Sequence, residues 1–383
     1  MNYYVKRFLT VWIFLVSLPA LASSLEYAVI VDAGSSGSRA HVFEYARALP
    51  MIPVPVINDF FNQSTKPGLS SYAPTGTGAG ASLKPILDAS VTALKEKGID
   101  PSQVPLKIFA TAGMRLLPLD QQEAIYDNVR AYVHANYTFQ LKDHNVRTIT
   151  GIMEGVYDWL DVNYLKNTFI NPQKTVGAID MGGASTQIAF ATHDSSKPEN
   201  EVVLTINHTV YRVFSQSFLG LGSNQAVQTM NSYTDAPNCY PSGYTFDMQT
   251  GDFNFSPCSN IYTDIINSFD VSQNVLPTTG VHFVAFSGVY NIFSFFDIIQ
   301  TPSQTALQSQ IDAICYLPWT TLLNNYPSIP PAFLSTNCAN GVYLDDLLYN
   351  TYQLQESQLT VATEIDGKGI DWTLGALLYS LVA

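Results

Sequence analysis

The stretch V-I-V-D-A-G-S-S-G-S-R at residues 29–39 decides the fold, together with a second copy of its pattern, G-A-I-D-M-G-G-A-S-T-Q, at residues 177–187. In each copy a short apolar run, typical of a buried strand, ends on an aspartate, Asp32 or Asp180. The chain then turns through small residues that leave backbone N–H groups uncovered. Such turns can surround a tetrahedral anion. Two copies indicate a duplicated pair of domains that grip one phosphorylated ligand.

These two loops supply the predicted phosphate-binding residues. A carboxylate beside bare N–H groups would repel phosphate unless a divalent cation lay between them, so Asp32 and Asp180 predict bound Mg²⁺ or Ca²⁺. One such turn alone would more often be an ordinary Asx turn, and it is the repetition that favours a phosphate cradle. The predicted loop residues are Gly34, Ser35, Ser36, Gly37, Ser38 and Arg39 in the first copy and Gly182, Gly183, Ala184 and Ser185 in the second.

Composition limits the classes of protein to which the chain can belong. At 383 residues it exceeds what one hydrophobic core usually organises, so two domains are expected. Hydrophobic residues make up 46% of it, which argues against disorder. The formal net charge is −13 at pH 7, so nucleic acid and anionic lipid are not expected partners. A polyanionic substrate would need local donors and a bound cation.

Residues 1–22 have the pattern of a secretory signal peptide. Lys6 and Arg7 precede an apolar run, and A-L-A at residues 20–22 resembles a small-x-small cleavage site. The run is shorter than the roughly 20 residues that a membrane span needs, although an uncleaved anchor is an alternative. We therefore expect a cleaved signal, no membrane span in the mature chain, and a secreted or periplasmic protein.

The four cysteines, Cys239, Cys258, Cys315 and Cys338, all lie in the second half. An even number in an exported chain favours disulfides, and three pairings are formally open. Sequential pairs, Cys239 with Cys258 and Cys315 with Cys338, are favoured because each closes a local loop. Zinc binding is disfavoured because no two cysteines have C-x2-C spacing.

Strand patterns alternate with helical ones along the chain, which predicts an α/β fold with mixed sheets. The clearest helix spans 151–165, and Asp120 with Glu123 suggests a capping pair for an earlier one. Residues 46–77 are rich in Pro, Gly and Ser and are expected to form a loop. Residues 224–280 are expected to form a loop-like insertion.

In its motifs the chain resembles the ecto-apyrases, the nucleoside triphosphate diphosphohydrolases, which belong to the actin, sugar-kinase and heat-shock ATPase superfamily. Without membrane helices at both ends, it is most similar to secreted soluble bacterial members of the kind found in Legionella. The motifs follow the family's order over nearly the whole mature chain: D-A-G-S-S-G-S-R (32–39), A-T-A-G-M-R (110–115), G-I-M-E-G-V-Y-D-W-L-D-V-N-Y-L (151–165), D-M-G-G-A-S-T-Q (180–187), F-S-G-V-Y-N (286–291) and D-W-T-L-G (371–375).

The resemblance implies roles for individual residues. Asp32 and Asp180 would face each other and hold the metal through its waters, and Glu154 would be the general base. Ser185 and Gln187 would orient the attacking water. Taken alone, Glu154 would be interpreted as an acid that complements a helix dipole.

Further residues take implied roles in the cleft. Thr111 would contact a metal-bound water, Trp372 would border the metal's hydration shell, and Arg115 would order the cleft. Asn163 is either a supporting cleft residue or a helix-face amide. Each has an ordinary structural alternative, such as core packing for Trp372 or a solvated surface for Arg115.

Base recognition is where the sequence departs from the family pattern. Family members commonly hold the nucleobase between two aromatic residues, at the position of Asn291 and near Tyr343. Asn291 lacks a full π surface, so a base-tolerant site is expected. Tyr343 has core packing as its alternative.

These observations together predict a two-domain, actin-like (ribonuclease H-like) α/β fold with a nucleotide cleft between the domains. Domain I would comprise residues 23–155 and 366–383, and domain II residues 156–365. The expected activity is metal-dependent hydrolysis of nucleoside tri- and diphosphates by a monomeric enzyme. The alternatives are a diphosphatase or polyphosphatase of the same fold, or a nucleotide-gated binding protein.

Overall fold

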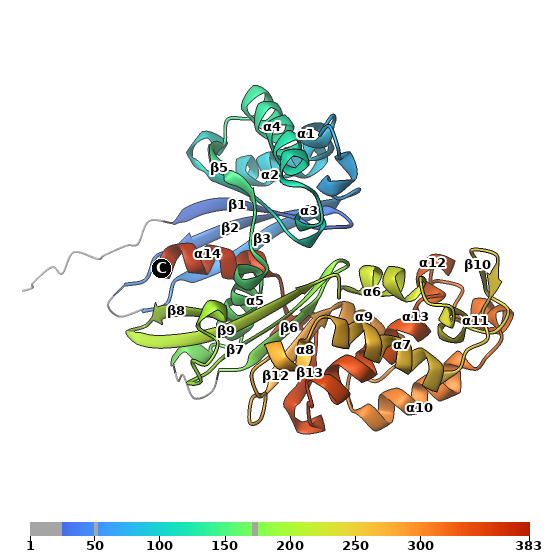
Figure 1. Cartoon of the computed structure of the whole chain (residues 1–383). Helices are drawn as coiled ribbons and strands as arrows, with labels where there is room; N and C mark the ends of the chain where they lie inside the picture. The colour runs from blue at the N-terminus through green and yellow to red at the C-terminus, as the bar shows by residue number, and fades with distance from the viewer. Residues whose placement is uncertain (1–24, 50–52, 171–174) are drawn as a thin grey trace, which may run out of the picture.

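The computed structural model describes residues 25–49, 53–170 and 175–383, so the expected signal peptide lies outside the described residues. The chain forms two lobes, each built on a β-sheet, with two helices packed between the sheets (Figure 1). Within the described part, no helix is both long and apolar enough to cross a membrane. The predicted α/β class with mixed sheets is confirmed.

The upper lobe is a five-stranded sheet in the order β3-β2-β1-β4-β5. Strands β1 and β2 form an antiparallel hairpin through the first predicted loop, β3 extends it, and β4 and β5 run parallel to β1. Helices cover this sheet, of which α2 and α4 are the longest (Figure 1). The bounds are β1 Glu26–Ala33, β2 Ser38–Ala46, β3 Val56–Thr65, β4 Pro105–Ala110, β5 Gln140–Thr148, α1 Ala79–Ser82, α2 Lys84–Glu96, α3 Ala112–Arg115 and α4 Leu119–Asn136.

The lower lobe repeats this topology in a six-stranded sheet of order β13-β12-β6-β7-β9-β8. Strands β6 and β7 form the antiparallel hairpin through the second loop, and β12 and β13 run parallel on its other side. Strands β9-β7-β6-β12-β13 thus correspond to β3-β2-β1-β4-β5, which confirms the duplication. The bounds are β6 Gly177–Met181, β7 Ser185–Ala191, β8 Glu201–Ile206, β9 Thr209–Leu219, β12 Phe283–Ser287 and β13 Leu359–Val361.

Two helices, α5 (Gly151–Leu165) and α14 (Trp372–Val382), join the lobes. Thr150 caps α5, because its side chain accepts a hydrogen bond from the Met153 backbone N–H at 3.2 Å. Side chains of both helices pack in one hydrophobic core with residues from both sheets, such as Ile30 from β1. The relative position of the two sheets therefore depends on this helix pair.

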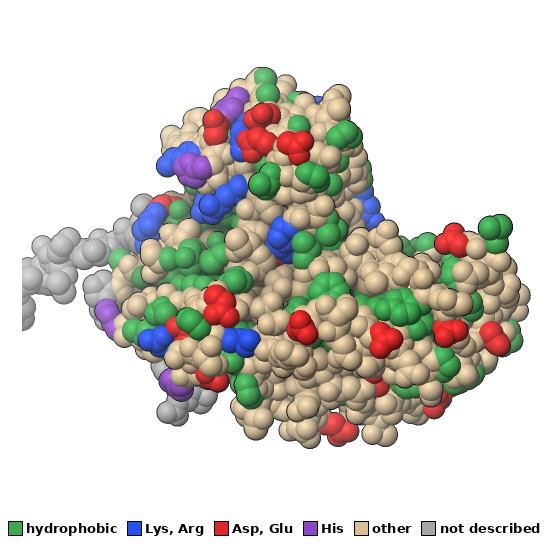
Figure 2. All heavy atoms as spheres, in the orientation of Figure 1, with side chains coloured by type: hydrophobic (Ala, Val, Ile, Leu, Met, Phe, Trp, Pro, Cys, Tyr) green, Lys and Arg blue, Asp and Glu red, His purple; other side chains and the backbone are tan. Residues whose placement is uncertain are grey.

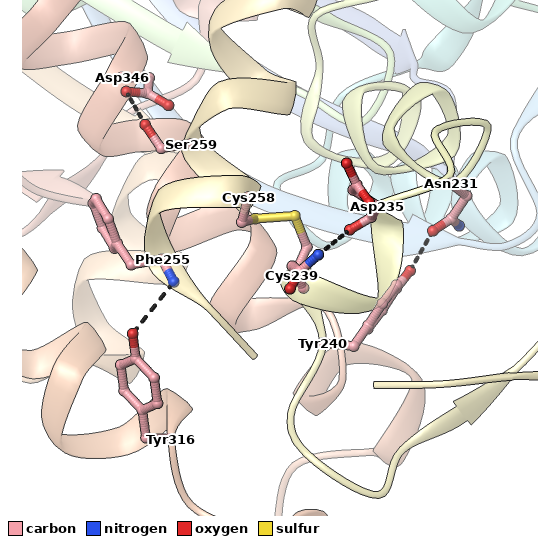
Figure 3. The surroundings of a disulfide bond; sticks show 10 residues. Asn231, Asp235, Cys239, Tyr240, Phe255, Cys258, Ser259, Tyr316 and Asp346 are labelled. Carbon is pink, nitrogen blue, oxygen red and sulfur yellow. Dashed lines mark hydrogen bonds between the residues drawn. A yellow bond between two sulfur atoms is a disulfide. The ribbon is translucent and has the colours of Figure 1, made fainter. Parts of the chain in front are cut away.

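The lower lobe also carries a helical layer, which Figure 1 shows beyond the sheet. Its two disulfides are Cys239–Cys258 and Cys315–Cys338, as the sequential pairing predicted (Figure 3 shows the first). The longer helices are α6 Ser223–Met230, α7 Phe255–Ser268, α9 Gly288–Phe295, α10 Gln304–Cys315, α11 Trp319–Asn325 and α13 Asn337–Leu344. A π-helix, Asp345–Thr351, continues α13. Short elements complete it: α8 Val271–Asn274, α12 Pro331–Leu334, and the hairpins β10 Thr245–Phe246 with β11 Gln249–Thr250 and β14 Glu364–Ile365 with β15 Lys368–Gly369.

Three local predictions were wrong. The expected loop at 46–77 contains β3, an edge strand whose mostly exposed polar residues hide the strand pattern. The expected loop-like insertion at 224–280 contains α6 and α7, whose apolar faces pack into the core of the lobe. Helix α4 begins after Pro118 without a side-chain cap, and Glu123 pairs with Arg130 instead.

The contact between α5 and α14 requires a glycine at position 375. A Cβ atom at Gly375 would lie 1.9 Å from the Tyr157 carbonyl oxygen of α5. We predict that Gly375→Ala lowers the free energy of unfolding by about 1–3 kcal/mol or more, because backbone atoms must move apart. Thermal unfolding measures this, with Gly369→Ala as the control, since a Cβ there meets no atom within 4 Å. Equal stability of the two variants would contradict the packing argument.

Candidate functional site

The two loops of the repeated motif lie at the junction of the lobes and line one cavity of about 280 Å³. The loops approach closely, since a Cβ at Gly183 would lie 2.8 Å from Ser35 Oγ. A wider cavity of about 1330 Å³ adjoins it, because both have Ser36 and Arg39 in their walls. All the predicted loop residues line the smaller cavity: Gly34, Ser35, Ser36, Gly37, Ser38, Arg39, Gly182, Gly183, Ala184 and Ser185.

Among the described residues that line the smaller cavity, only Arg39 and Lys66 have cationic side chains. On the face drawn in Figure 2, acidic side chains are scattered across the lower lobe. This agrees with the formal net charge of −13. Attraction of a phosphate must therefore come from groups inside the cleft, such as backbone N–H groups, Arg39 and Lys66, which line the smaller cavity.

Asp32 and Asp180 line this same cavity from opposite sheets. Each has an Oδ1 atom that is buried and lacks a hydrogen-bond partner. Burial raises the pKa of Asp180 to about 7. The pKa of Asp32 is raised well above its ordinary value, first by burial and then by the charges of Asp371 and Glu154. One oxygen of each carboxylate therefore has no donor among the described residues that would stabilise its charge.

Glu154, in the first turn of α5, belongs to a hydrogen-bonded cluster. Arg115 Nη2 donates to Glu154 Oε2 at 2.6 Å and to Ser185 Oγ at 3.0 Å. Gln187 Nε2 lies 3.1 Å from the same Glu154 oxygen and 2.6 Å from Ser185 Oγ. Glu154 and Ser185 line the cavity, with Gln187 and Arg115 behind them. The structure therefore brings these four predicted residues together.

Burial raises the pKa of Glu154, and the positive charge and hydrogen bond of Arg115 oppose that effect. The ion pair with Arg115 favours the ionised form of Glu154, and this is the form that can accept a proton. The cluster therefore supplies a base at the wall of the cavity.

Three other predicted residues also lie in the cleft. Thr111 and Trp372 are buried and line the smaller cavity, and the Trp372 ring is stacked near Tyr157 with centroids 6.2 Å apart. Asn291, at the start of α9, is exposed and lines the wider cavity.

Asn163 and Tyr343 lie outside both cavities, in positions that match the structural alternative given for each. The amide of Asn163 is fully buried, and its Nδ2 donates to the carbonyls of Trp159 at 2.8 Å and Val176 at 2.9 Å. It joins α5 to the segment that enters β6. Tyr343 is fully buried, its hydroxyl donates to the Leu221 carbonyl at 2.6 Å, and its ring stacks on another core tyrosine.

Sequence reasoning missed Asp158, one helical turn beyond Glu154. Asp158 is 1% exposed, and neither of its carboxylate oxygens has a partner. Burial, followed by the charges of Asp180 and Glu154, raises its pKa well above the ordinary value. The available signal was the spacing of Glu154, Asp158 and Asp161 along one side of an otherwise apolar helix.

It also missed Ser287, whose φ of 54° is unusual for a residue other than glycine. Ser287 is the N-cap residue of α9 and lines both cavities. Its side chain forms a hydrogen bond with Asp180, and this bond lowers the pKa of Asp180, whereas burial raises it. Strained backbone of this kind is concentrated at functional sites.

The cavity suits a divalent cation with oxygen ligands. Unpartnered buried oxygens of Asp32, Asp180 and Asp158 lie in or near it, and Mg²⁺ and Ca²⁺ prefer such hard oxygen donors. Among the described residues no group of three or more His, Cys, Asp or Glu side chains is arranged to ligate a metal directly. Mg²⁺ commonly keeps several waters and touches few carboxylates. The residues present fit such a hydrated ion.

The repeated topology and the cleft between the two sheets define a two-lobed, actin-like phosphate-binding protein. Among solved structures, the chain is similar to a nucleoside triphosphate hydrolase from Neospora caninum, with a TM-score of 0.67, 17% identity and coverage of 94% of this chain and 92% of that one. It is also similar to a Ppx/GppA protein from Aquifex aeolicus, with a TM-score of 0.57, 13% identity and coverage of 94% and 98%. These likenesses show the fold.

Residues 20–383 match the model of the GDA1/CD39 (nucleoside phosphatase) family, and the chain belongs to that family. It is 26% identical to probable apyrase 3 of Arabidopsis thaliana, over 96% of this chain and 84% of that protein. It is 29% identical to ectonucleoside triphosphate diphosphohydrolase 8 of Gallus gallus, over 94% and 83%. The chain is thus an enzyme, a nucleoside phosphatase, as the motifs predicted.

The buried carboxylates make a prediction about stability. Groups such as Asp158 and Asp180 bind protons more tightly in the folded chain than unfolded, so their contribution to stability is greatest at low pH and is lost as pH rises toward their folded pKa, about 7 for Asp180. With a chelator present, we expect Tm to fall from pH 5 to pH 8. Asp158→Asn should stabilise the chain at pH 8 by about 1–3 kcal/mol and flatten the pH dependence.

The control is Asp312→Asn on the exposed side of α10, which should leave the dependence of Tm on pH unchanged. Destabilisation by Asp158→Asn at pH 8 would show that Asp158 has a partner that stabilises its charge.

Proposed function

We propose that the chain is an apyrase that hydrolyses nucleoside tri- and diphosphates in a metal-dependent reaction, removing the γ- and then the β-phosphate to leave the monophosphate. The observation that carries this is the placement of Glu154, Ser185 and Gln187 beside the two loops and beside Asp32 and Asp180, each of which has a buried Oδ1 atom without a partner. A phosphoanhydride needs donors for its oxygens, a cation, and a base that activates water.

In the proposed mechanism, backbone N–H groups and serine hydroxyls of both loops hold the phosphate oxygens. Glu154 accepts a proton from a water while the water oxygen attacks the terminal phosphorus, and the bond from that phosphorus to the bridging oxygen breaks. Ser185 and Gln187 orient the water, and Arg115 keeps Glu154 ionised. No phosphoenzyme forms, because the nucleophile is water.

A hydrated Mg²⁺ or Ca²⁺ would be held by Asp32 and Asp180, with Thr111 and Trp372 beside its waters. When bound it would neutralise charge on the phosphate oxygens. The same ion would relieve the repulsion between these buried carboxylates and the substrate.

The nucleobase is proposed to lie in the wider cavity. Asn291, which lines this cavity, would provide one side of the site. Phe333, which is 59% exposed and lines this cavity, takes the place expected for Tyr343 as the aromatic partner.

We propose that the cleft separates domain I, residues 23–155 and 366–383, from domain II, residues 156–365. The enzyme would be monomeric, and secreted or periplasmic after removal of residues 1–22. The two disulfides support an oxidising compartment.

The base assignment has a direct test. Glu154→Gln should lower kcat for ATP by about 10²–10⁴-fold, because the amide cannot accept the proton, while a non-hydrolysable ATP analogue still binds. Phosphate release and calorimetry measure the two effects, and Glu123→Gln on exposed α4 is the control. Wild-type phosphate release by Glu154→Gln would refute the assignment.

Metal dependence is tested separately. Chelation should abolish phosphate release from ATP and ADP, and added Mg²⁺ or Ca²⁺ should restore it. Asp180→Asn should raise the concentration of Mg²⁺ needed for half-maximal activity by about tenfold or more, because it removes a charge that faces the ion. Full activity in a chelator would exclude the proposed mechanism.

A further inference from the structure

Two asparagine amides on α13 line the wider cavity, and no hydrogen bond joins either side chain to the part of the chain that the structure describes. Asn337 is 9% exposed and Asn340 is 6% exposed, and both line this cavity. Among the described residues, none is hydrogen-bonded to either side chain, and Asn340 Oδ1 is buried with no partner at all. They lie three residues apart, so they project from one side of the helix.

A buried polar atom without a partner, such as Asn340 Oδ1, costs about 1–3 kcal/mol. The same chain pairs a buried amide fully where the role is structural, because Asn163 bonds to Trp159 and Val176. Asn163 has partners for its amide, whereas Asn337 and Asn340 have none among the described residues, and this difference is expected of side chains that bind a ligand.

Helix α13 holds the two amides in a fixed position. The Cys315–Cys338 disulfide ties the helix to α10. A Cβ at Gly341 would lie 2.6 Å from the Phe296 ring, so the helix packs closely on the core at this point. The amides are therefore preorganised on the cavity wall, which lowers the entropy cost of binding.

We propose that Asn337 and Asn340 hydrogen-bond the edge of the nucleobase and thereby select nucleotides over phosphate chains that carry no base. This inference rests on the proposed function. Phe333 and Asn291 would contact the faces of the base in the same cavity. An amide offers both a donor and an acceptor, and every nucleobase has edge groups of a matching kind. The pair therefore recognises a base without demanding a particular one.

The test compares ATP with inorganic tripolyphosphate, which has the phosphates but no base. Asn337→Ala and Asn340→Ala should each raise KM for ATP about fivefold, and the double variant about tenfold or more. The KI of tripolyphosphate as a competitive inhibitor should stay unchanged. Binding of adenosine 5′-(β,γ-imido)triphosphate, measured by calorimetry, should weaken in step with KM.

Stability separates a ligand-binding role from a structural one. Removing an unpaired buried amide should leave the Tm of the unliganded protein unchanged or raise it. Asn350→Ala is the matched control: Asn350 lies on the π-helical continuation of α13, outside the cavity lining, and bonds to Asp346 and Gln304. Its KM for ATP should remain that of the wild type.

An unchanged KM for ATP in the double variant overturns the inference, as does a KI of tripolyphosphate that rises together with KM. Failure of the proposed function would look different: wild-type protein would then release no phosphate from ATP or ADP. Even in that case, calorimetry with the imido analogue would report whether the two amides contribute to nucleotide binding.

Discussion

Buried negative charge is the constraint on which the cleft depends. Carboxylates from both sheets and from α5 meet there, and the charges of Asp371 and Glu154 raise the pKa of Asp32 in addition to the effect of burial. The positive groups that pair with them are few. Arg115 holds Glu154, and His41 holds Asp371 at 3.2 Å. The remaining charge must be balanced by protons or by a cation, which agrees with the proposal that the cleft binds a metal-bound phosphate.

His41 shows how this charge balance is built into the fold. Its ring contacts Asp59 of β3 at 2.7 Å and Asp371 at 3.2 Å, and despite burial these carboxylates raise its pKa to about 10. The protonated ring lowers the pKa of Asp371, which caps α14 through Thr373 and accepts no proton near neutrality. The Asp371 N–H also donates to Asp161 of α5. One imidazolium thus connects the first sheet to the helix pair that joins the lobes.

The parts that the sequence predicted correctly are those set by local pattern. The two D-x-G turns are recognised from an apolar strand followed by small residues, and the helix at 151–165 from its apolar face. These patterns can be identified in the sequence itself. Tyr343 and Asn163 could not be judged in this way, because whether a helical residue faces a cleft or the core depends on which helix packs against it. Asp158 was missed for the same reason, because only the tertiary packing shows that both of its carboxylate oxygens are buried without a hydrogen-bond donor.

In the proposed reaction, the two ends of the substrate would be recognised by different parts of the fold. The phosphate end meets loops contributed by both sheets, so its chemistry requires the duplicated topology and the α5–α14 contact that sets the distance between the loops. The base end meets α9, α12 and α13, which all belong to the helical layer of one lobe and are held by its disulfide. Base selection can therefore change through exposed residues such as Phe333, because Arg115 and Gln187, which donate hydrogen bonds to the Glu154 carboxylate, lie outside that layer.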